Sequence, residues 1–302
     1  MYDIIGDIHG YCSKLKKLLH KLGYLEAGGT YFHEKRKVIF VGDYIDRGPE
    51  IRDTLHLVKS MVDANAAIAI MGNHEYNAMA YNTQLVDGTY LREHHAVHNH
   101  QHQATLSQFS EHPKEWKTYL EWFTSLPLFL ELPGLRAVHA CWDEAHIQWL
   151  KSENHSTLTH ELLIQSHKKG SLAYQVINDT LKGKEFNIPE KYVWYDKDGH
   201  ARTANRVKWW VQPQNAKFGN FLFDCPGSLQ AQKISPGTRL NIYPAKAPPV
   251  FFGHYWLEDP FPEIRTKNVI CLDYSVAKKG LLVAYRWNGE EKIDNKHFVF
   301  VR

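Results

Sequence analysis

The chain has 302 residues, of which 43% are hydrophobic and 23% are charged, and its formal net charge is +3. These values are ordinary for a soluble globular protein with one large α/β domain or two small ones. The small net charge argues against a protein that binds nucleic acid or an anionic membrane. No apolar run approaches the roughly 20 residues that a membrane-spanning helix needs.

The four cysteines lie far apart in the sequence and include no CxxC pair. Such a pattern favours reduced thiols over a disulfide framework. Residues 2–5 lead directly into the motif GDIHG at 6–10, which leaves no room for the charged and apolar regions of a signal peptide. We therefore expect a cytoplasmic protein.

The first 71 residues predict strands that alternate with helices. Leucines at helical spacing within 12–22 predict one helix, and a second is predicted over 51–62, after Pro49. Apolar runs predict buried strands at 2–5, 37–41 and 66–71. Alternation at this pitch indicates βαβ units and a parallel sheet, in which ligands bind at the carboxyl ends of the strands.

The remaining chain departs from this alternation. Residues 76–130 predict a helical insertion that ends in an amphipathic helix over 116–126. Further strands are predicted at 135–138, 207–211 and 249–252. Three C-terminal runs predict antiparallel strands, at 269–272, 281–287 and 297–301. We expect a single domain over residues 1–302, with insertions at about 76–130 and 143–235.

Five short motifs place metal-binding residue types at the ends of predicted strands. They are GDIHG at 6–10, GDYIDRG at 42–48, GNHE at 72–75, VHA at 138–140 and GH at 253–254. Carboxylate, amide and imidazole groups suit manganese, iron or zinc better than a metal that prefers thiolates. The first three motifs directly follow strands of the predicted parallel sheet, so they should meet at one edge. The sequence therefore indicates a metal-dependent hydrolase.

The candidate ligands divide into two groups that share one carboxylate. The first group is Asp7, His9 and Asp43, and the second is Asp43, Asn73, His139 and His254. Two ions about 3.5–4 Å apart can activate a bridging hydroxide and clamp phosphate oxygens during in-line attack.

Three neighbouring residues fit catalytic roles. His74 could protonate the leaving oxygen, and Asp46 could hold that imidazole charged and oriented. Arg47 offers a planar fork that suits a phosphoryl group.

In these motifs the chain resembles the metallophosphoesterases of the calcineurin-like superfamily, and most of all the bacterial members of the phosphoprotein phosphatase branch. The resemblance runs from residue 6 to residue 254. It implies the ligand assignment above, the His74–Asp46 pair, and contact of substrate phosphate with Arg47 and Asn73. It also implies a four-layer α-β-β-α sandwich with two central mixed sheets. The implied cofactor is two divalent or mixed-valence metal ions, with manganese expected first and iron or zinc as alternatives.

The chain differs from the eukaryotic protein phosphatases outside the ligand set. Met71 precedes GNHE where those enzymes carry arginine, and Ala140-Cys141 replaces two glycines. The segment 272–275 stands where those enzymes have SAPNY. The resemblance also implies a second phosphate-binding arginine, within 196–210. Arg202 and Arg206 are both candidates.

Two further clusters have competing interpretations. Histidines occur at positions 94, 95, 98, 100 and 102. They could form a third metal site, but they lack cysteine, and we expect a solvated surface. The aromatic pairs Trp194-Tyr195 and Trp209-Trp210 could stack on a nucleobase, but we expect core packing.

We expect a phosphatase that hydrolyses phosphate monoesters by direct attack of a metal-bridging hydroxide, and first of all a phosphoprotein phosphatase. A dinucleoside polyphosphate hydrolase of the diadenosine tetraphosphate type is the alternative, as is a phosphatase of nucleic-acid ends. A different class would be a non-catalytic binding protein on the same fold. The expected partner is thus a phosphorylated protein or a small phosphoester or nucleotide. No membrane partner is expected, and the near-neutral charge disfavours nucleic acid.

Overall fold

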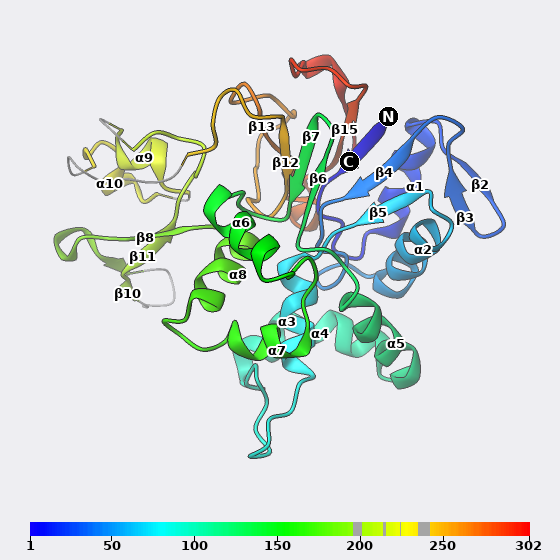
Figure 1. The fold of residues 1–302 in the computed structure, drawn as a ribbon, viewed down its shortest axis with the longest axis horizontal. Coiled ribbons are helices and arrows are strands. Elements are labelled where there is room, and N and C mark those ends of the chain that lie inside the picture. The colour runs from blue at the N-terminus through cyan, green and yellow to red at the C-terminus, as the bar shows by residue number, and fades with distance from the viewer. Residues whose placement is uncertain (196–200, 214–215, 224, 235–241) are drawn as a thin grey trace.

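The computed structural model describes residues 1–195, 201–213, 216–223, 225–234 and 242–302 (Figure 1). Its first large sheet combines parallel and antiparallel strands, in the order β14-β15-β1-β4-β5, with β16 also paired to β15. The strands are β1 (Tyr2–Ile5), β4 (Lys37–Phe40), β5 (Ala67–Ala69), β14 (Asp273–Tyr274), β15 (Leu281–Trp287) and β16 (Phe298–Val301). Strands β1, β4 and β5 are parallel, and β15 is antiparallel to β1.

The second large sheet is also mixed and has the order β13-β12-β7-β6. Its strands are β6 (Phe129–Leu132), β7 (Leu135–Val138), β12 (Val250–Phe252) and β13 (Val269–Cys271). Short strand pairs lie outside the two sheets: β2 (Leu25–Ala27) with β3 (Thr30–Phe32), β8 (Glu185–Asn187) with β11 (Ala204–Arg206), and β9 (Trp194–Tyr195) with β10 (Ala201–Arg202).

Helices flank the two sheets. They are α1 (Cys12–Lys21), α2 (Ile51–Asp63), α3 (Asn73–Tyr81), α4 (Ala96–Phe109), α5 (Pro113–Phe123), α6 (Glu144–Ser152), α7 (His160–Gln165), α8 (Leu172–Lys182), α9 (Phe218–Phe221) and α10 (Gly227–Gln230). In Figure 1, α1 and α2 lie to the right of the first sheet, whereas α6 and α8 lie to the left, on the side of the second sheet. The predicted α/β class and its α-β-β-α layering are therefore confirmed. None of the described helices is both long enough and apolar enough to cross a bilayer.

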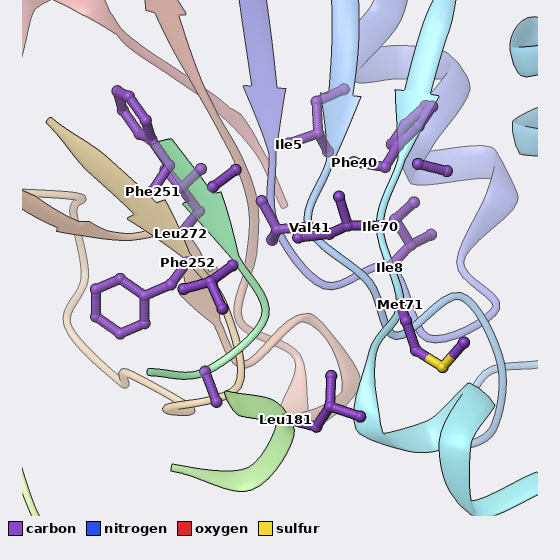
Figure 2. Close-up of a cluster of buried hydrophobic side chains, with 14 of the residues drawn as sticks. Ile5, Ile8, Phe40, Val41, Ile70, Met71, Leu181, Phe251, Phe252 and Leu272 are labelled. Atoms are coloured by element: carbon purple, nitrogen blue, oxygen red, sulfur yellow. The ribbon is translucent and has the colours of Figure 1, made fainter. Parts of the chain in front are cut away.

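A buried apolar cluster joins the two sheets at the strand ends that carry the motifs (Figure 2). Ile5, Val41 and Ile70 come from the first sheet side, and Phe251 comes from β12 of the second. Leu181, near the end of α8, adds to the same cluster. Full burial of such a side chain contributes about 1.5–3 kcal/mol to the stability of the fold. The cluster therefore fixes the relative position of the loops that follow these strands.

Two predictions of local structure are wrong. Residues 207–211 do not form a strand: Val207 makes an isolated bridge to Leu222, and Trp209 and Trp210 lie in a turn. The reason is packing, because both indole rings contact Phe252, and Trp209 Nε1 donates a hydrogen bond to the carbonyl of Ala140. The two tryptophans thus pack in the core as expected.

The run at 269–272 forms β13, which pairs parallel to β12 rather than antiparallel to a neighbour. Of the other aromatic pair, Tyr195 is 71% exposed, whereas Trp194 packs partly against the core.

Candidate metal centre

The structure brings the six predicted ligands together where strands of both sheets end. Matched register places Ile5, Phe40 and Ala69 side by side in β1, β4 and β5, so the loops that follow begin at one edge. Those loops carry Asp7, Asp43 and Asn73, while His139 and His254 follow β7 and β12 of the second sheet.

Asp43 lies at the centre of the cluster. Its Oδ2 atom is 3.7 Å from His9 Nε2, and its Oδ1 atom is 3.4 Å from His139 Nε2. Ligand-type atoms within 4.8 Å of one another form two sets, His9 with Asp43 and His74, and Asp43 with His139 and His254. Both sets contain Asp43, and the first contains His74 where the sequence analysis expected Asp7.

The remaining two predicted ligands lie beside these sets. Asn73 Oδ1 is 2.9 Å from His139 Nε2. Asp7 belongs to neither set, but its Oδ2 atom accepts a hydrogen bond from the His254 backbone N–H at 2.9 Å. All six side chains are buried.

Each candidate histidine ligand is oriented through one ring nitrogen. His9 Nδ1 donates to the carbonyl of Ile45, and His139 Nδ1 donates to the carbonyl of Val41. His254 uses the opposite nitrogen, because its Nε2 donates to the carbonyl of Lys182 at 3.0 Å. A carbonyl can only accept, so the second nitrogen of each ring is turned toward the cluster, as in histidines that bind metals.

Four buried ligand-type atoms in this cluster have no hydrogen-bond partner among the described residues. They are Asp7 Oδ1, His9 Nε2, Asp43 Oδ2 and His254 Nδ1. Leaving one buried polar group unpaired costs about 1–3 kcal/mol, and four at one place need a common explanation. Divalent cations supply it, because each of these atoms is a metal-ligand type. The residues present therefore fit the metal ions.

Electrostatics support the same interpretation. Burial, together with the neighbouring Asp273 and Asp43 carboxylates, raises the pKa of Asp7 well above its usual value. Burial lowers the pKa of His9 to about 4, so its imidazole is neutral at neutral pH and can offer a lone pair. A buried group of carboxylates beside the neutral imidazole of His9 is a favourable environment for a cation.

The backbone at the site is held in an unusual conformation. Among the described residues, ten non-glycine residues have a left-handed φ, and five of them are predicted site residues: His9, Asp43, Asp46, Arg47 and His254. Such conformations cost about 1–3 kcal/mol each and persist where the surroundings enforce them. Gly72 permits the close approach of two loops, because a Cβ atom there would lie 2.2 Å from the backbone nitrogen of Asp43.

Glu75 enforces this loop geometry. Its buried carboxylate accepts hydrogen bonds from the backbone N–H groups of Asp43, Tyr44 and Gly72, at 2.8–3.0 Å. It therefore joins the loop after β4 to the loop after β5. Glu75 lies inside the GNHE motif, but sequence reasoning gave it no role, because two of its three partners, Asp43 and Tyr44, lie 32 and 31 positions away along the chain.

His74 and Asp46 form the predicted pair, with 2.5 Å between His74 Nδ1 and Asp46 Oδ2. Burial opposes protonation of His74, but the charges of Asp43 and Asp46 raise its pKa to about 9. The other ring nitrogen, Nε2, lies 3.9 Å from Asp43 Oδ2. His74 thus presents Nε2 toward the candidate metal ligands.

Helix α4 supplies two further contacts to Asp46. His102 Nδ1 donates to Asp46 Oδ1 at 2.8 Å, and Thr105 Oγ1 donates to the same atom at 2.5 Å. The expectation of a solvated histidine cluster is therefore wrong for His102, which is buried. It holds for His95 and His100, which are exposed. The signal in the sequence that could have indicated these two contacts was spacing, because residues three apart, such as His102 and Thr105, share one face of a helix.

Asp273 is a second residue that sequence reasoning did not assign to the site. It is buried, and its two oxygens accept hydrogen bonds from the backbone N–H groups of Trp256 and Ser275. Its charge acts on Asp7, so the acidic cluster extends to the strand β14.

The three candidate arginines lie in different surroundings. Arg47 is exposed, with its guanidinium carbon 5.1 Å from the centre of the Trp256 ring. Arg206 is half-buried and lies 5.6 Å from the ring of Tyr255, the residue after His254. Arg202 is exposed on β10. Residues 196–200 of the segment that was expected to supply the second phosphate arginine lie outside the described residues.

Two mixed sheets whose strand ends carry carboxylates and imidazoles are typical of the class of metal-binding α/β proteins. The family model for the calcineurin-like phosphoesterases matches residues 2–220 of the chain. The chain therefore belongs to the calcineurin-like phosphoesterase family, whose members use divalent metal ions.

Curated relatives include two bacterial proteins named asymmetrical bis(5′-nucleosyl)-tetraphosphatase PrpE. The protein from Oceanobacillus iheyensis is 33% identical to this chain, and the match covers 46% of this chain and 54% of the relative. The protein from a Geobacillus strain is 34% identical, and the match covers 46% of this chain and 55% of the relative. The chain thus spans about half the length of the curated relatives it matches.

Among solved structures, a protein serine/threonine phosphatase from Saccharomyces cerevisiae matches 99% of this chain and 78% of its own. The identity is 13% and the TM-score 0.50, a likeness that concerns the fold.

Replacement of Asp43 by Asn should weaken both metal sites together. Because both ligand sets contain this carboxylate, we expect manganese affinity to fall by at least about 100-fold, since loss of a residue that merely supports a ligand already costs about 10–100-fold. Calorimetric titration of metal-free protein gives the affinities and the stoichiometry, and circular dichroism checks the fold. Asp53→Asn, at an exposed carboxylate, is the matched control. Two ions bound by Asp43→Asn with unchanged affinity would contradict the assignment.

Proposed function

We propose that the chain hydrolyses phosphoric esters or anhydrides at two divalent metal ions. The observation that carries this proposal is the convergence of four unpartnered, buried ligand atoms around Asp43. The ligands are Asp7, His9, Asp43, Asn73, His139 and His254, as expected from the sequence. Manganese is the first metal to test. Divalent ions, when bound, activate a water molecule as nucleophile and neutralise the oxygens of a phosphoryl group.

The protein's own residues supply the proton and the orientation. His74 holds a proton at Nε2 and donates it to the oxygen of the leaving group. Asp46 stabilises the imidazolium through Nδ1 and fixes the ring plane, and is itself held by His102 and Thr105. A non-catalytic binding protein would not need this hydrogen-bonded series beside the ligands.

Two arginines bind the phosphoryl oxygens in this proposal. Arg47 rests on Trp256 with its charge exposed at the rim of the site. We choose Arg206 rather than Arg202 as the second arginine, because it neighbours the His254 loop through Tyr255 and its buried Nε atom has no hydrogen-bond partner among the described residues. A guanidinium is well suited to this contact, because it can donate two parallel hydrogen bonds to one phosphoryl group.

For the substrate we propose a dinucleoside polyphosphate, with a phosphoprotein as the second candidate. The names of the curated relatives support the first choice. The likeness to the yeast phosphatase supports the fold and carries no preference for a protein substrate.

A substrate panel tests this proposal directly. With manganese and equal enzyme, we expect kcat/KM for diadenosine tetraphosphate to exceed that for phosphopeptides and for nucleic-acid 5′ ends by at least about tenfold. His74→Asn should reduce turnover by about 10²–10⁴-fold, the usual worth of a general acid. Preference for phosphopeptides would overturn the substrate assignment. Failure of the wild type to hydrolyse any compound, including p-nitrophenyl phosphate, would overturn the activity.

His102 should act through Asp46 on the proton of His74. His102→Leu removes a hydrogen bond to a charged group, worth about 1.5–3 kcal/mol, so we expect kcat for phenyl phosphate to fall by about 10–100-fold. The loss should be much smaller for p-nitrophenyl phosphate, whose leaving group needs little protonation. His102→Gln, which keeps a donor, should restore part of the activity, and His100→Leu on the exposed side of α4 is the control. Equal losses for both esters would mean a purely structural role.

A further inference from the structure

Three cations lie beside the candidate metal centre without a carboxylate within ion-pair distance in the described part of the chain. They are Arg92, Lys182 and Arg206. All three are half-buried rather than fully solvated. A surface cation needs no partner, but a half-buried group of like charges is costly unless an anion balances it. Their positions therefore indicate a place where an anion binds.

Lys182 is adjacent to the metal ligands through its own backbone. Its carbonyl accepts the hydrogen bond that orients His254, and its side chain extends to the ring of Tyr76, with 4.7 Å between Nζ and the ring centre. Tyr76 lies one helical turn after Asn73 on α3, so both are on the same face of that helix. The ammonium group thus contacts α3 one helical turn after the ligand Asn73.

Arg206 approaches Lys182 from the other side. Its Cδ atom lies 3.2 Å from the position of a Cβ atom on Gly183, the residue that follows Lys182. Its buried Nε atom donates no hydrogen bond to any residue that the structure describes. The side chains of Lys182 and Arg206 therefore flank the same loop after α8, where the ligand His254 is anchored.

Arg92 lies against both α3 and α4. Its guanidinium donates hydrogen bonds to Asn77 Oδ1 and Gln101 Oε1, which are both neutral. Asn77 lies one turn after His74, and a small cavity between them is lined by Asp46, His74, Asn77, Arg92, Gln101 and His102. Arg92 is thus fixed beside the group that would protonate the leaving oxygen.

We propose that Lys182, with Arg92, binds the phosphoryl group next to the one that is cleaved and held by Arg206, and so selects substrates with a polyphosphate chain over simple monoesters. The site would hold the second phosphoryl group while the first lies at the metal centre. This inference rests on the proposed function and assigns a role to residues outside the ligand set. It explains why two cations contact α3 at Tyr76 and Asn77, one helical turn after Asn73 and His74.

Binding measurements on manganese-loaded protein test the inference without relying on turnover. Imidodiphosphate, which resists hydrolysis, should bind the wild type at least about tenfold more tightly than orthophosphate, with free manganese held in excess. Lys182→Met keeps the apolar stem over Tyr76 and removes the charge, so this preference should fall to about twofold or less. Lys182→Arg should retain it. Lys117→Met, at an exposed lysine of α5, is the charge-matched control and should behave as the wild type. Arg92→Gln gives a second test if Lys182→Met does not fold.

Kinetics separate this inference from the proposed function. The ratio of kcat/KM for diadenosine tetraphosphate over p-nitrophenyl phosphate should fall at least about tenfold in Lys182→Met, mainly through KM. Equal losses for both substrates, or no preference for imidodiphosphate over orthophosphate in the wild type, would overturn the subsite and leave the hydrolase proposal standing. A wild type that binds imidodiphosphate through Lys182 but hydrolyses neither substrate would overturn the proposed function and leave the subsite standing.

Discussion

The structure depends on one buried carboxylate, that of Asp43, which belongs to both sets of candidate ligands. It is 1% exposed and lies between His9 on one side and His139 on the other. Burial opposes its ionisation, but His139 and His74 hold the pKa of Asp43 well below its usual range. An ionised carboxylate in such a position must be surrounded by cations or donors, because an unpaired buried charge is not tolerated. The placement of the surrounding loops follows from this requirement.

The loops meet that requirement by adopting costly conformations, which the packing beneath them stabilises. Left-handed backbone at Asp43 and His254 turns their side chains inward, and Glu75 locks two of the loops through three backbone amides. The apolar cluster that joins the sheets packs at the strand ends from which these loops leave (Figure 2). Strain at a functional site is possible in a marginally stable protein only when such packing offsets it.

The sequence was sufficient to predict the fold class and the convergence of the motif residues. Strands that end at a glycine next to Asp, Asn or His are visible as apolar runs, and parallel strands bring their ends to one edge. The contacts of His102 and Thr105 with Asp46 were not predictable, because they cross 56 and 59 positions of the chain. Likewise, the parallel pairing of β13 with β12 depends on the path of the chain that connects them. An apolar run in the sequence does not indicate the direction of the strand that it forms. The turn at Trp209 and Trp210 depends on contacts with the ring of Phe252 in β12, which only folding brings near these residues.

The central claim is that Asp43 is shared by two metal ions. Crystals of the manganese-loaded protein, measured at the manganese absorption edge, test it most directly. The account predicts two anomalous peaks about 3.5–4 Å apart, one on each side of Asp43, with Asp7 and His9 at the first and Asn73, His139 and His254 at the second. A single peak, or peaks that do not contact Asp43, would contradict it.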